Sequence, residues 1–406
     1  MQWQRELETI LAEDERSART RETSAFDEAT GPSSASLVLV GGGNLGRKVL
    51  RGLRDTGRDV VAFADSNSRL WGTTIEGVPA MSPESAAKKF GTSSAFVVCI
   101  WHPDRKQGVQ HHIARMKALG AAKTVPFVWL FWKYAETFLP YYLWDLPSNI
   151  PSHAKDIREA CAALATDRDR ATYVSHLAFR SRADFSRQPE PDAPPAYFPA
   201  DLFELLPDEE FVDCGAFDGD SIQSFLDVSA GKFSRIHAFE SDPASFASLQ
   251  RFIAASSDVA PRTLLHRKAV SSRVGTVRFA ATAQENAAIS VDGEIEVSCT
   301  TLDATLADHR PSFIKMDIEG AEIDALRGAR NIVARHKPLL AICIYHRQSD
   351  LWHIPLLMRE LEPDSSLSLR SYWLDGFDLV CYAVPPHRRK QQLGAVEERT
   401  YVKVPG

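Results

Sequence analysis

The chain has 406 residues, of which 44% are hydrophobic and 25% are charged, and its formal net charge is −6. This composition excludes a wholly disordered, collagen-like or coiled-coil protein, and the length predicts two or three domains. A protein that binds nucleic-acid backbones is usually basic, so the acidic balance disfavours general nucleic-acid binding. We expect a reduced, cytoplasmic protein, because the six cysteines form no CxxC pair and neither a signal peptide nor a transmembrane stretch is evident.

Two alternations of apolar strands and helical patterns predict an α/β fold with two Rossmann-like units. Five prolines between residues 189 and 199 mark a joint between these units. We therefore divide the chain into a charged N-terminal extension with a short helix and a loose segment (1–35), a Rossmann-like unit (36–150), a helical connector and proline-rich linker (151–200), a second Rossmann-like unit (201–386) and an exposed polar tail (387–406).

The first unit carries a glycine-rich motif, GGGNLG, over residues 41–46. The motif follows a predicted strand and opens a predicted helix, and an acid stands about twenty residues further on, as in dinucleotide-binding loops. Small residues let backbone amides approach a phosphate, and the acid can hold ribose hydroxyls. The candidate nucleotide-binding residues are therefore Gly41, Gly43, Asn44, Gly46 and Asp65. The alternative is a glycine turn that only allows close packing of strand and helix.

An unusually aromatic segment follows over residues 126–147, with nine aromatic residues between Phe127 and Trp144. Charged residues and prolines interrupt it, so it is not a membrane span. We expect the last strand of the first unit and an aromatic layer between the units. A surface that stacks on sugars or contacts a membrane interface is the alternative.

A second glycine motif, DCGAFDGD, occupies residues 213–220 and again ends a predicted strand. Gly215 and Gly219 allow close approach of a ligand, and Asp213 offers a carboxylate to an ammonium group. Glu240 ends the next predicted strand and can accept hydrogen bonds from two ribose hydroxyls. A ligand with both features is S-adenosylmethionine, and the alternative is a turn acid with a surface glutamate. The candidate cofactor-binding residues are Asp213, Gly215, Ala216, Phe217, Asp218, Gly219, Glu240 and Ser241.

A third charged segment, KMDIEG, begins at Lys315. Strand alternation places Lys315, Asp317 and Glu319 on one face if the strand stays extended. The next predicted strand delivers His346 to the same edge, and histidine is well suited to proton transfer near neutral pH. We predict His346 as the general base, with Asp317 or Glu319 as its orienting partner or as an alternative base. The alternatives are an ion pair of Lys315 with Asp317, a structural histidine, or a divalent-metal site formed by Asp317, Glu319 and His346.

A hairpin is predicted at the end of the second unit. Two apolar runs, 369–374 and 379–384, flank Asp375-Gly376-Phe377, and Asp-Gly between such runs is a strong hairpin signal. The second unit is therefore expected to be a parallel sheet that ends in an antiparallel hairpin.

Taken in order, these motifs resemble the FkbM-type family of S-adenosylmethionine-dependent methyltransferases. The resemblance covers residues 200–386 and rests on FVDCGAFDGD (211–220), IHAFESDP (236–243), Thr301-Leu302-Asp303, IKMDIEGAE (314–322), Tyr345-His346 and the hairpin. The family commonly has proline after the glutamate, where this chain has Ser241.

The resemblance implies a seven-stranded methyltransferase sheet and transfer of a methyl group to a hydroxyl of a sugar, nucleotide sugar, glycan or secondary metabolite. It assigns Asp213, Gly215 and Gly219 to the cofactor loop and Glu240 to the ribose. It places Asp317, Glu319 and His346 near the acceptor. The first unit is similar to Rossmann-like domains that join some FkbM-type proteins and to nucleotide-sugar-binding domains, which hints at a nucleotide-linked sugar as the acceptor.

Two other functions remain open on the sequence. An NAD(P)-dependent oxidoreductase would use Gly41, Gly43, Gly46 and Asp65, although the second unit offers no clear hydride-transfer residues. A nucleotide-sugar-binding protein with a degenerate methyltransferase-like unit is the second. The sequence leaves the acceptor atom, metal dependence and oligomeric state undecided.

Overall fold

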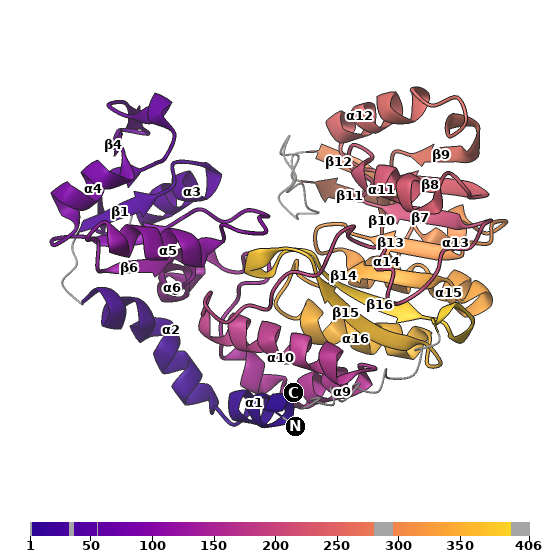
Figure 1. The fold of residues 1–406 in the computed structure, drawn as a ribbon, viewed down its shortest axis with the longest axis horizontal. Coiled ribbons are helices and arrows are strands. Elements are labelled where there is room, and N and C mark those ends of the chain that lie inside the picture. The colour runs from indigo at the N-terminus through magenta and orange to yellow at the C-terminus, as the bar shows by residue number, and fades with distance from the viewer. Residues whose placement is uncertain (1, 32–35, 55, 280–294, 391–406) are drawn as a thin grey trace, which may run out of the picture.

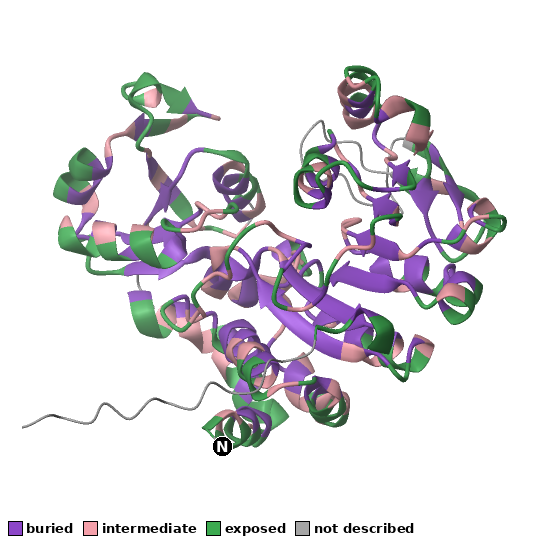
Figure 2. Ribbon diagram, turned by 45° about the vertical axis from the view of Figure 1, so that its right-hand side comes forward, coloured by how far each residue is buried: buried purple, intermediate pink, exposed green. Residues whose placement is uncertain are grey.

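The computed structural model describes residues 2–31, 36–54, 56–279 and 295–390. Two α/β units lie side by side, and helices from the N-terminus and the connector lie below them in the view of Figure 1. The central strands of both units are buried and the surrounding helices expose one side to solvent, as Figure 2 shows. The predicted α/β fold with two Rossmann-like units is confirmed.

The first sheet has six strands in the order β3-β4-β2-β1-β5-β6. All its pairs are parallel except β3 with β4. The apolar runs predicted as strands are its buried centre. Its strands are β1 (Ser36–Val40), β2 (Asp59–Ala64), β3 (Thr74–Ile75), β4 (Val78–Met81), β5 (Ala95–Val98) and β6 (Thr124–Pro126), and its helices are α3 (Asn44–Leu53), α4 (Pro83–Phe90), α5 (Val109–Ala118), α6 (Phe127–Lys133) and α7 (Ala135–Phe138).

The second sheet has seven strands in the order β15-β16-β14-β13-β7-β8-β9. The strands β14, β13, β7, β8 and β9 run parallel, and the predicted hairpin adds β16 and β15 in antiparallel pairing. Its strands are β7 (Glu210–Cys214), β8 (Arg235–Phe239), β9 (Thr263–His266), β13 (Phe313–Met316), β14 (Leu339–Cys343), β15 (Ser366–Ser371) and β16 (Leu379–Val384).

Six helices accompany the second sheet, and a small separate sheet pairs its strands in the order β10-β12-β11. The helical segment between β13 and β14 is divided into two helices at Gly328, which packs against Ser271, whose carbonyl oxygen would lie 2.1 Å from an added Cβ. The elements are α11 (Asp220–Ser229), α12 (Pro243–Ala254), α13 (Leu302–Thr305), α14 (Glu322–Arg327), α15 (Arg330–His336), α16 (Asp350–Leu361), β10 (Ala269–Val270), β11 (Gly275–Phe279) and β12 (Ile295–Thr300).

Five helices belong to the N-terminal extension and the connector: α1 (Gln2–Leu11), α2 (Glu15–Thr30), α8 (Asn149–Ser152), α9 (Ala154–Ala163) and α10 (Asp167–Arg182). The extension was predicted to be one short helix and a loose segment, which is wrong. Asp14 caps α2 by accepting a hydrogen bond from the Ser17 amide, and Phe26 of α2 is wholly buried. The extension is therefore part of the folded core.

The predicted exposed tail is wrong at Arg388, while the other described tail residues, His387, Arg389 and Lys390, are exposed. Arg388 is 4% exposed, and its guanidinium pairs with Glu209 at 2.8 Å. Ser312 donates a further hydrogen bond to the same carboxylate. Residues 391–406 lie outside the described part of the chain.

Aromatic side chains form a layer between the two units, as predicted. The ring of Trp101, which follows β5, lies 4.5 Å from that of Phe377 in the loop between β15 and β16. Trp101 also contacts Phe127 at 5.6 Å, and Trp144 contacts Phe179 of α10 at 4.9 Å. Such tilted and edge-on contacts are favourable for aromatic rings.

The loop 372–378 between β15 and β16 is held by the first unit through hydrogen bonds. Arg105 donates to the Tyr372 carbonyl at 2.6 Å, and the Leu374 amide donates to the Asp104 carbonyl at 3.0 Å. Asp375, which is 1% exposed, accepts a bond from the Val109 amide at 2.8 Å. Helix α5 has no capping side chain of its own, so the second unit caps a helix of the first.

We expect Asp375→Ala to lower the free energy of unfolding by about 1–3 kcal/mol, because the buried Val109 amide loses its acceptor. Urea unfolding at pH 8 measures this, since burial raises the pKa of Asp375 to about 6 and the carboxylate is charged there. Asp364→Ala is the control, because that side chain is 72% exposed in the same unit and its loss costs less than about 0.5 kcal/mol. Equal stability of wild type and Asp375→Ala contradicts the interpretation.

Candidate functional site

A cavity of about 540 Å³ lies at the carboxyl edge of the second sheet. Ligands of open parallel sheets bind at this edge because the loops after the strands meet there. The loops after β7, β8, β13 and β14 line it, together with the linker at 194–197 and the loop 372–378. The first unit contributes Pro103 to the wall.

The loop after β7 turns sharply because of its glycines. Gly215 has a φ of +82°, and an added Cβ would lie 1.9 Å from the carbonyl oxygen of Asp317. Gly219 has a φ of +103°, and an added Cβ would strike the ring of Phe252. These positions need glycine, and the turn brings Gly215 and Phe217 to the cavity. Of the other predicted loop residues, Ala216 is wholly buried and Asp218 is exposed to solvent.

Glu240 follows β8 and faces the same loop. Its Oε2 accepts a hydrogen bond from the Phe217 amide at 2.9 Å, and its Oε1 accepts one from the Asp242 amide at 2.7 Å. Glu240 and Ser241 both line the cavity. Burial raises the pKa of Glu240 above its usual value, and the two amides act against this by stabilising the carboxylate. Glu240 thus lies beside the glycine loop at the cavity, and its contact with a ribose stays a prediction.

Asp213 does not face the cavity, contrary to our prediction that it binds the cofactor. It is wholly buried, and its carboxylate lies 3.0 Å from Nζ of Lys315 on the neighbouring strand. Ser221 donates a hydrogen bond to its other oxygen at 2.5 Å. Lys315 also donates to the Gly215 carbonyl at 2.7 Å. Lys315, which we listed with the candidate catalytic residues, therefore pairs with Asp213 and not with Asp317, the partner in our alternative interpretation, and it holds the glycine loop in place.

Asp317 lies at the cavity floor with three donors around it. Tyr197 donates to its Oδ2 at 2.7 Å and Tyr345 to its Oδ1 at 3.3 Å, and Nε2 of His346 lies 3.2 Å from Oδ1. Burial raises the pKa of Asp317, but the bond with His346 and the charge of Lys315 outweigh it, and the pKa is lowered overall. Asp317 is thus a stable carboxylate.

His346 lies behind Asp317, between two carboxylates. Its Nδ1 is 2.9 Å from Oε1 of Glu322, a residue we did not predict. Burial lowers the pKa of His346, but Glu322 and Asp317 together raise it well above its usual value. The ring therefore holds its proton, is 4% exposed and is not among the described residues that line the cavity. This argues against our prediction that His346 is the general base.

The predicted metal set also differs from the arrangement found. The polypeptide turns at Glu319, whose φ is +55°, so β13 ends at Met316 and does not present Glu319 along an extended face. Glu319 lies 3.9 Å from Nε2 of His346 and lines the cavity. Glu322 takes the place of Glu319 in the group that could hold an ion, because one ligand atom each of Asp317, Glu322 and His346 lies within 4.8 Å of the others.

The comparisons with known proteins agree with this geometry. Residues 213–363 match the family model of the methyltransferase FkbM domain. A search of curated proteins finds no match.

One solved structure matches nearly the whole chain. It is a methyltransferase FkbM from Methylobacillus flagellatus KT, with 24% identity and a TM-score of 0.76 over 94% of this chain and 98% of that chain. RSP, a Rex-family repressor, matches 21% of this chain and 42% of its own at 21% identity and a TM-score of 0.19. SMU.1697c from Streptococcus mutans, solved with SAH, matches 46% of this chain and 93% of its own at 12% identity and a TM-score of 0.27. The first of these likenesses shows the fold of the chain.

Two cavity residues beyond the predicted set come from the loop 372–378, next to the FkbM domain. Trp373 and Asp378 line the cavity, and Nε1 of Trp373 donates a hydrogen bond to Asp378 at 2.7 Å. Burial, reinforced by the charge of Asp317, raises the pKa of Asp378 to about 7. The sequence signal that could have located these two residues is the predicted antiparallel hairpin. The start of β16 lies beside the end of β14, at the carboxyl edge of the sheet.

The glycine motif of the first unit lies at the start of α3, as predicted. The carboxylate of Asp65 accepts hydrogen bonds from the Gly42 amide at 2.6 Å and the Asn67 amide at 2.7 Å. An added Cβ at Gly46 would lie 2.0 Å from the carbonyl oxygen of Gly41, so close packing accounts for this glycine. Gly43 has open space around it, and Asn44 begins the helix. Nucleotide binding here stays a prediction.

We expect Lys315→Met to lower the free energy of unfolding by about 3–5 kcal/mol, because Asp213 would be left as a buried, unpaired charge. Urea denaturation measures the loss. The double variant Asp213→Asn, Lys315→Met removes both charges and should recover part of it. A double variant that is no more stable than Lys315→Met contradicts the ion-pair interpretation.

Proposed function

We propose that the protein is an S-adenosylmethionine-dependent O-methyltransferase that acts on a hydroxyl group of a sugar, a nucleotide sugar, a glycan or a related secondary metabolite. The observation that carries the proposal is the cavity itself. One end is formed by the glycine loop and Glu240, and the other is lined by carboxylates and aromatic rings. The methyltransferase FkbM domain supports the transfer of a methyl group.

The residues at the first end suit the cofactor. The sharp turn at Gly215 leaves room that a side chain would fill, and Glu240 presents a carboxylate beside the loop amides. A carboxylate in this place can accept hydrogen bonds from the two hydroxyls of a ribose. S-adenosylmethionine supplies a methyl group on an electrophilic sulfonium centre when bound. Lys315 and Asp213 hold the loop in this shape and do not themselves touch the ligand in our proposal.

The second end suits a neutral, hydroxylated acceptor. Glu319, Asp317 and Asp378 offer carboxylate oxygens, which accept hydrogen bonds from hydroxyl groups. Trp373 and Tyr345 add aromatic surface, on which the apolar face of a sugar ring can pack. The residues then orient one hydroxyl toward the cofactor end, which is the main task of an enzyme whose cofactor is already reactive.

The acceptor proton needs a base, and Asp378 fits that role better than His346. Asp378 lines the cavity, and Trp373 orients its carboxylate. Its pKa of about 7 is suited to accepting a proton near neutral pH. Asp317 has a lowered pKa and three donors, so we assign it the binding of the acceptor.

The first test is calorimetric titration of the full-length protein with S-adenosylhomocysteine. We expect micromolar binding that Glu240→Ala weakens by at least about tenfold, because the variant loses the ribose acceptor. Asp65→Ala is the matched control, since Asp65 makes the same kind of bond to a glycine-rich loop in the other unit, and it should bind as wild type does.

A folded wild-type protein that does not bind S-adenosylhomocysteine contradicts the proposal. Loss of binding in Asp65→Ala with retention in Glu240→Ala would place the ligand in the first unit, and NAD(H) would then be tested there.

The second test concerns the base. Transfer of a labelled methyl group is measured against a panel of nucleotide sugars and glycosides, and the rate is then followed against pH. A base must be deprotonated, so kcat should rise as the pH increases through about 7 and level off above it.

Asp378→Asn should lower kcat by about 10²-fold or more and remove this rise, with S-adenosylhomocysteine binding unchanged. His346→Gln is the comparison variant. If that variant abolishes the rise and Asp378→Asn keeps it, the base is His346 and our assignment is wrong.

A further inference from the structure

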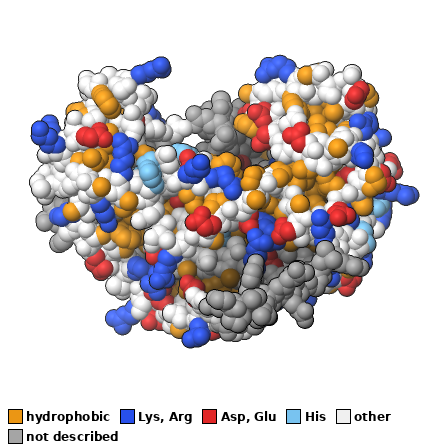
Figure 3. All heavy atoms as spheres, in the orientation of Figure 1, with side chains coloured by type: hydrophobic (Ala, Val, Ile, Leu, Met, Phe, Trp, Pro, Cys, Tyr) orange, Lys and Arg blue, Asp and Glu red, His pale blue; other side chains and the backbone are white. Residues whose placement is uncertain are grey.

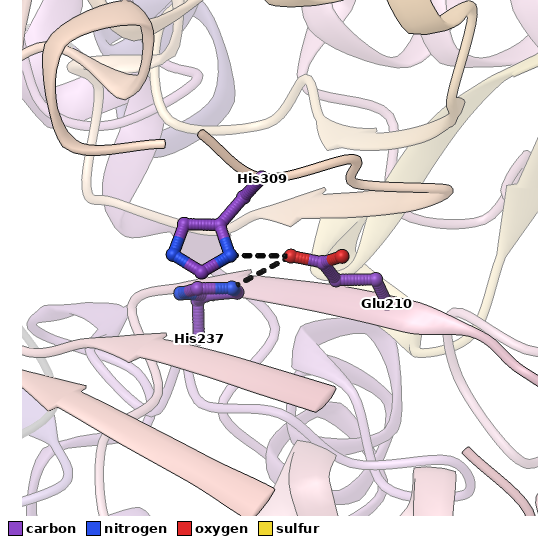
Figure 4. A group of neighbouring side chains, drawn as sticks. All are labelled: Glu210, His237 and His309. Carbon is purple, nitrogen blue, oxygen red and sulfur yellow. Dashed lines mark hydrogen bonds and ion pairs between the residues drawn. The ribbon is translucent and has the colours of Figure 1, made fainter. Parts of the chain in front are cut away.

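A second group of metal-binding side chains lies in the second unit, away from the cavity. Glu210 begins β7, His237 lies within β8, and His309 lies in the segment before β13 (Figure 4). Glu210 precedes Asp213 by three residues of extended strand, which is roughly 10 Å. The group therefore lies toward the amino end of the sheet and takes no part in the proposed methyl transfer.

The three side chains converge on one point. Nε2 of His237 lies 2.9 Å from Oε1 of Glu210, and Nδ1 of His309 lies 3.1 Å from the same oxygen. All three ligand atoms are within 4.8 Å of one another. Ligands of a tetrahedral zinc ion are about 3.3 Å apart, at bond lengths near 2.0–2.2 Å. Shifts of a few tenths of an ångström would bring these atoms into range.

The surroundings hold the ligands in place. The Arg310 amide donates to Oε2 of Glu210 at 3.3 Å, which leaves Oε1 directed at the two imidazoles. His237 is wholly buried and its ring lies 5.7 Å from that of His266 in a stacked arrangement. Outer contacts of this kind orient metal ligands. The His309 side chain is 27% exposed, so water can reach the group from one side.

Hydrogen bonding alone accounts poorly for this group. Nδ1 of His237 is buried without a partner among the described residues, and such an atom costs about 1–3 kcal/mol. A strand that buries a histidine at this cost has to recover the free energy elsewhere. A cation on Nε2 would not give Nδ1 a partner, but it would stabilise the three ligand atoms together, because two neutral imidazoles and a carboxylate carry a net negative charge and are all ligands of borderline metals.

We propose that Glu210, His237 and His309 bind one divalent transition-metal ion, with zinc as the best match to two imidazoles and one carboxylate. Water completes a four-coordinate site on the side where His309 is exposed. The ion joins the start of β7, the middle of β8 and the segment that leads into β13. Its role is structural.

The group Asp317, Glu322 and His346 is the comparison within this chain. There the ligand atoms also lie within 4.8 Å of one another, but the two carboxylates contact different nitrogens of one ring, and two tyrosine hydroxyls already donate to Asp317. At Glu210 the two rings meet one oxygen, as Figure 4 shows, and the ligand atoms face the same point. This difference selects the first group as the metal site.

The test is titration of tag-free, EDTA-treated full-length protein with Zn²⁺, followed by calorimetry. We expect one ion per chain with a dissociation constant below about 1 µM. Glu210→Gln keeps the shape of the side chain and His309→Ala changes a partly exposed residue, and each should weaken binding by about 100-fold or more. Zn²⁺ should also raise the melting temperature of wild type and not of these variants.

His387→Ala is the control, because it removes an exposed histidine elsewhere, and it should bind as wild type does. Unchanged S-adenosylhomocysteine binding by wild type and variants verifies that they are folded, or, if wild type lacks it, near-identical circular dichroism does. Binding weaker than about 100 µM overturns the proposal, as does binding that Glu210→Gln and His309→Ala retain. Loss of the ion in Asp317→Asn alone would place it at the cavity and also overturns the proposal.

Discussion

The buried ammonium of Lys315 is the interaction on which the cavity depends. It pairs with Asp213 on the adjacent strand, donates to the carbonyl of Gly215 and lies 5.2 Å from the ring of Tyr197. Burial lowers the pKa of the lysine, but Asp213 and Asp317 raise it overall, so the group keeps its charge. One cation thus fixes the glycine loop on one side and stabilises the carboxylate of Asp317 on the other.

The second constraint is the contact between the units. The loop 372–378 carries Trp373 and Asp378 into the cavity, and the residues between them are bonded to the first unit. Asp375 caps α5, and Trp101 packs on Phe377. The first unit therefore supports the part of the cavity wall formed by the loop 372–378, whether or not it binds a ligand of its own. Positively and negatively charged side chains are interspersed on the face drawn in Figure 3. None of the described helices is long and apolar enough to span a membrane.

The sequence predicted what depends on local pattern. Apolar runs located the parallel strands, Asp-Gly located the hairpin, and the spacing of Glu240 from the glycine loop indicated their contact. Prediction from the sequence failed where a side chain can pair with either of two residues that lie far apart in the chain. Lys315 was paired with Asp317 on strand alternation, but register places it opposite Asp213. Glu322 was missed because the turn at Glu319 reverses the backbone, which periodicity does not show.

Contacts between segments that are distant in the chain also explain why the two glycine motifs are not equivalent. In each unit an acid after the second strand accepts a bond from the amide of the preceding glycine loop, Asp65 from Gly42 and Glu240 from Phe217. In the first unit the close approach of Gly46 to Gly41 accounts for the last glycine of the motif. In the second, the loop borders a cavity together with residues of the linker, of the loop after β13 and of the loop 372–378. A glycine motif thus reports a tight turn, and the packing of distant segments decides which cavity the turn borders.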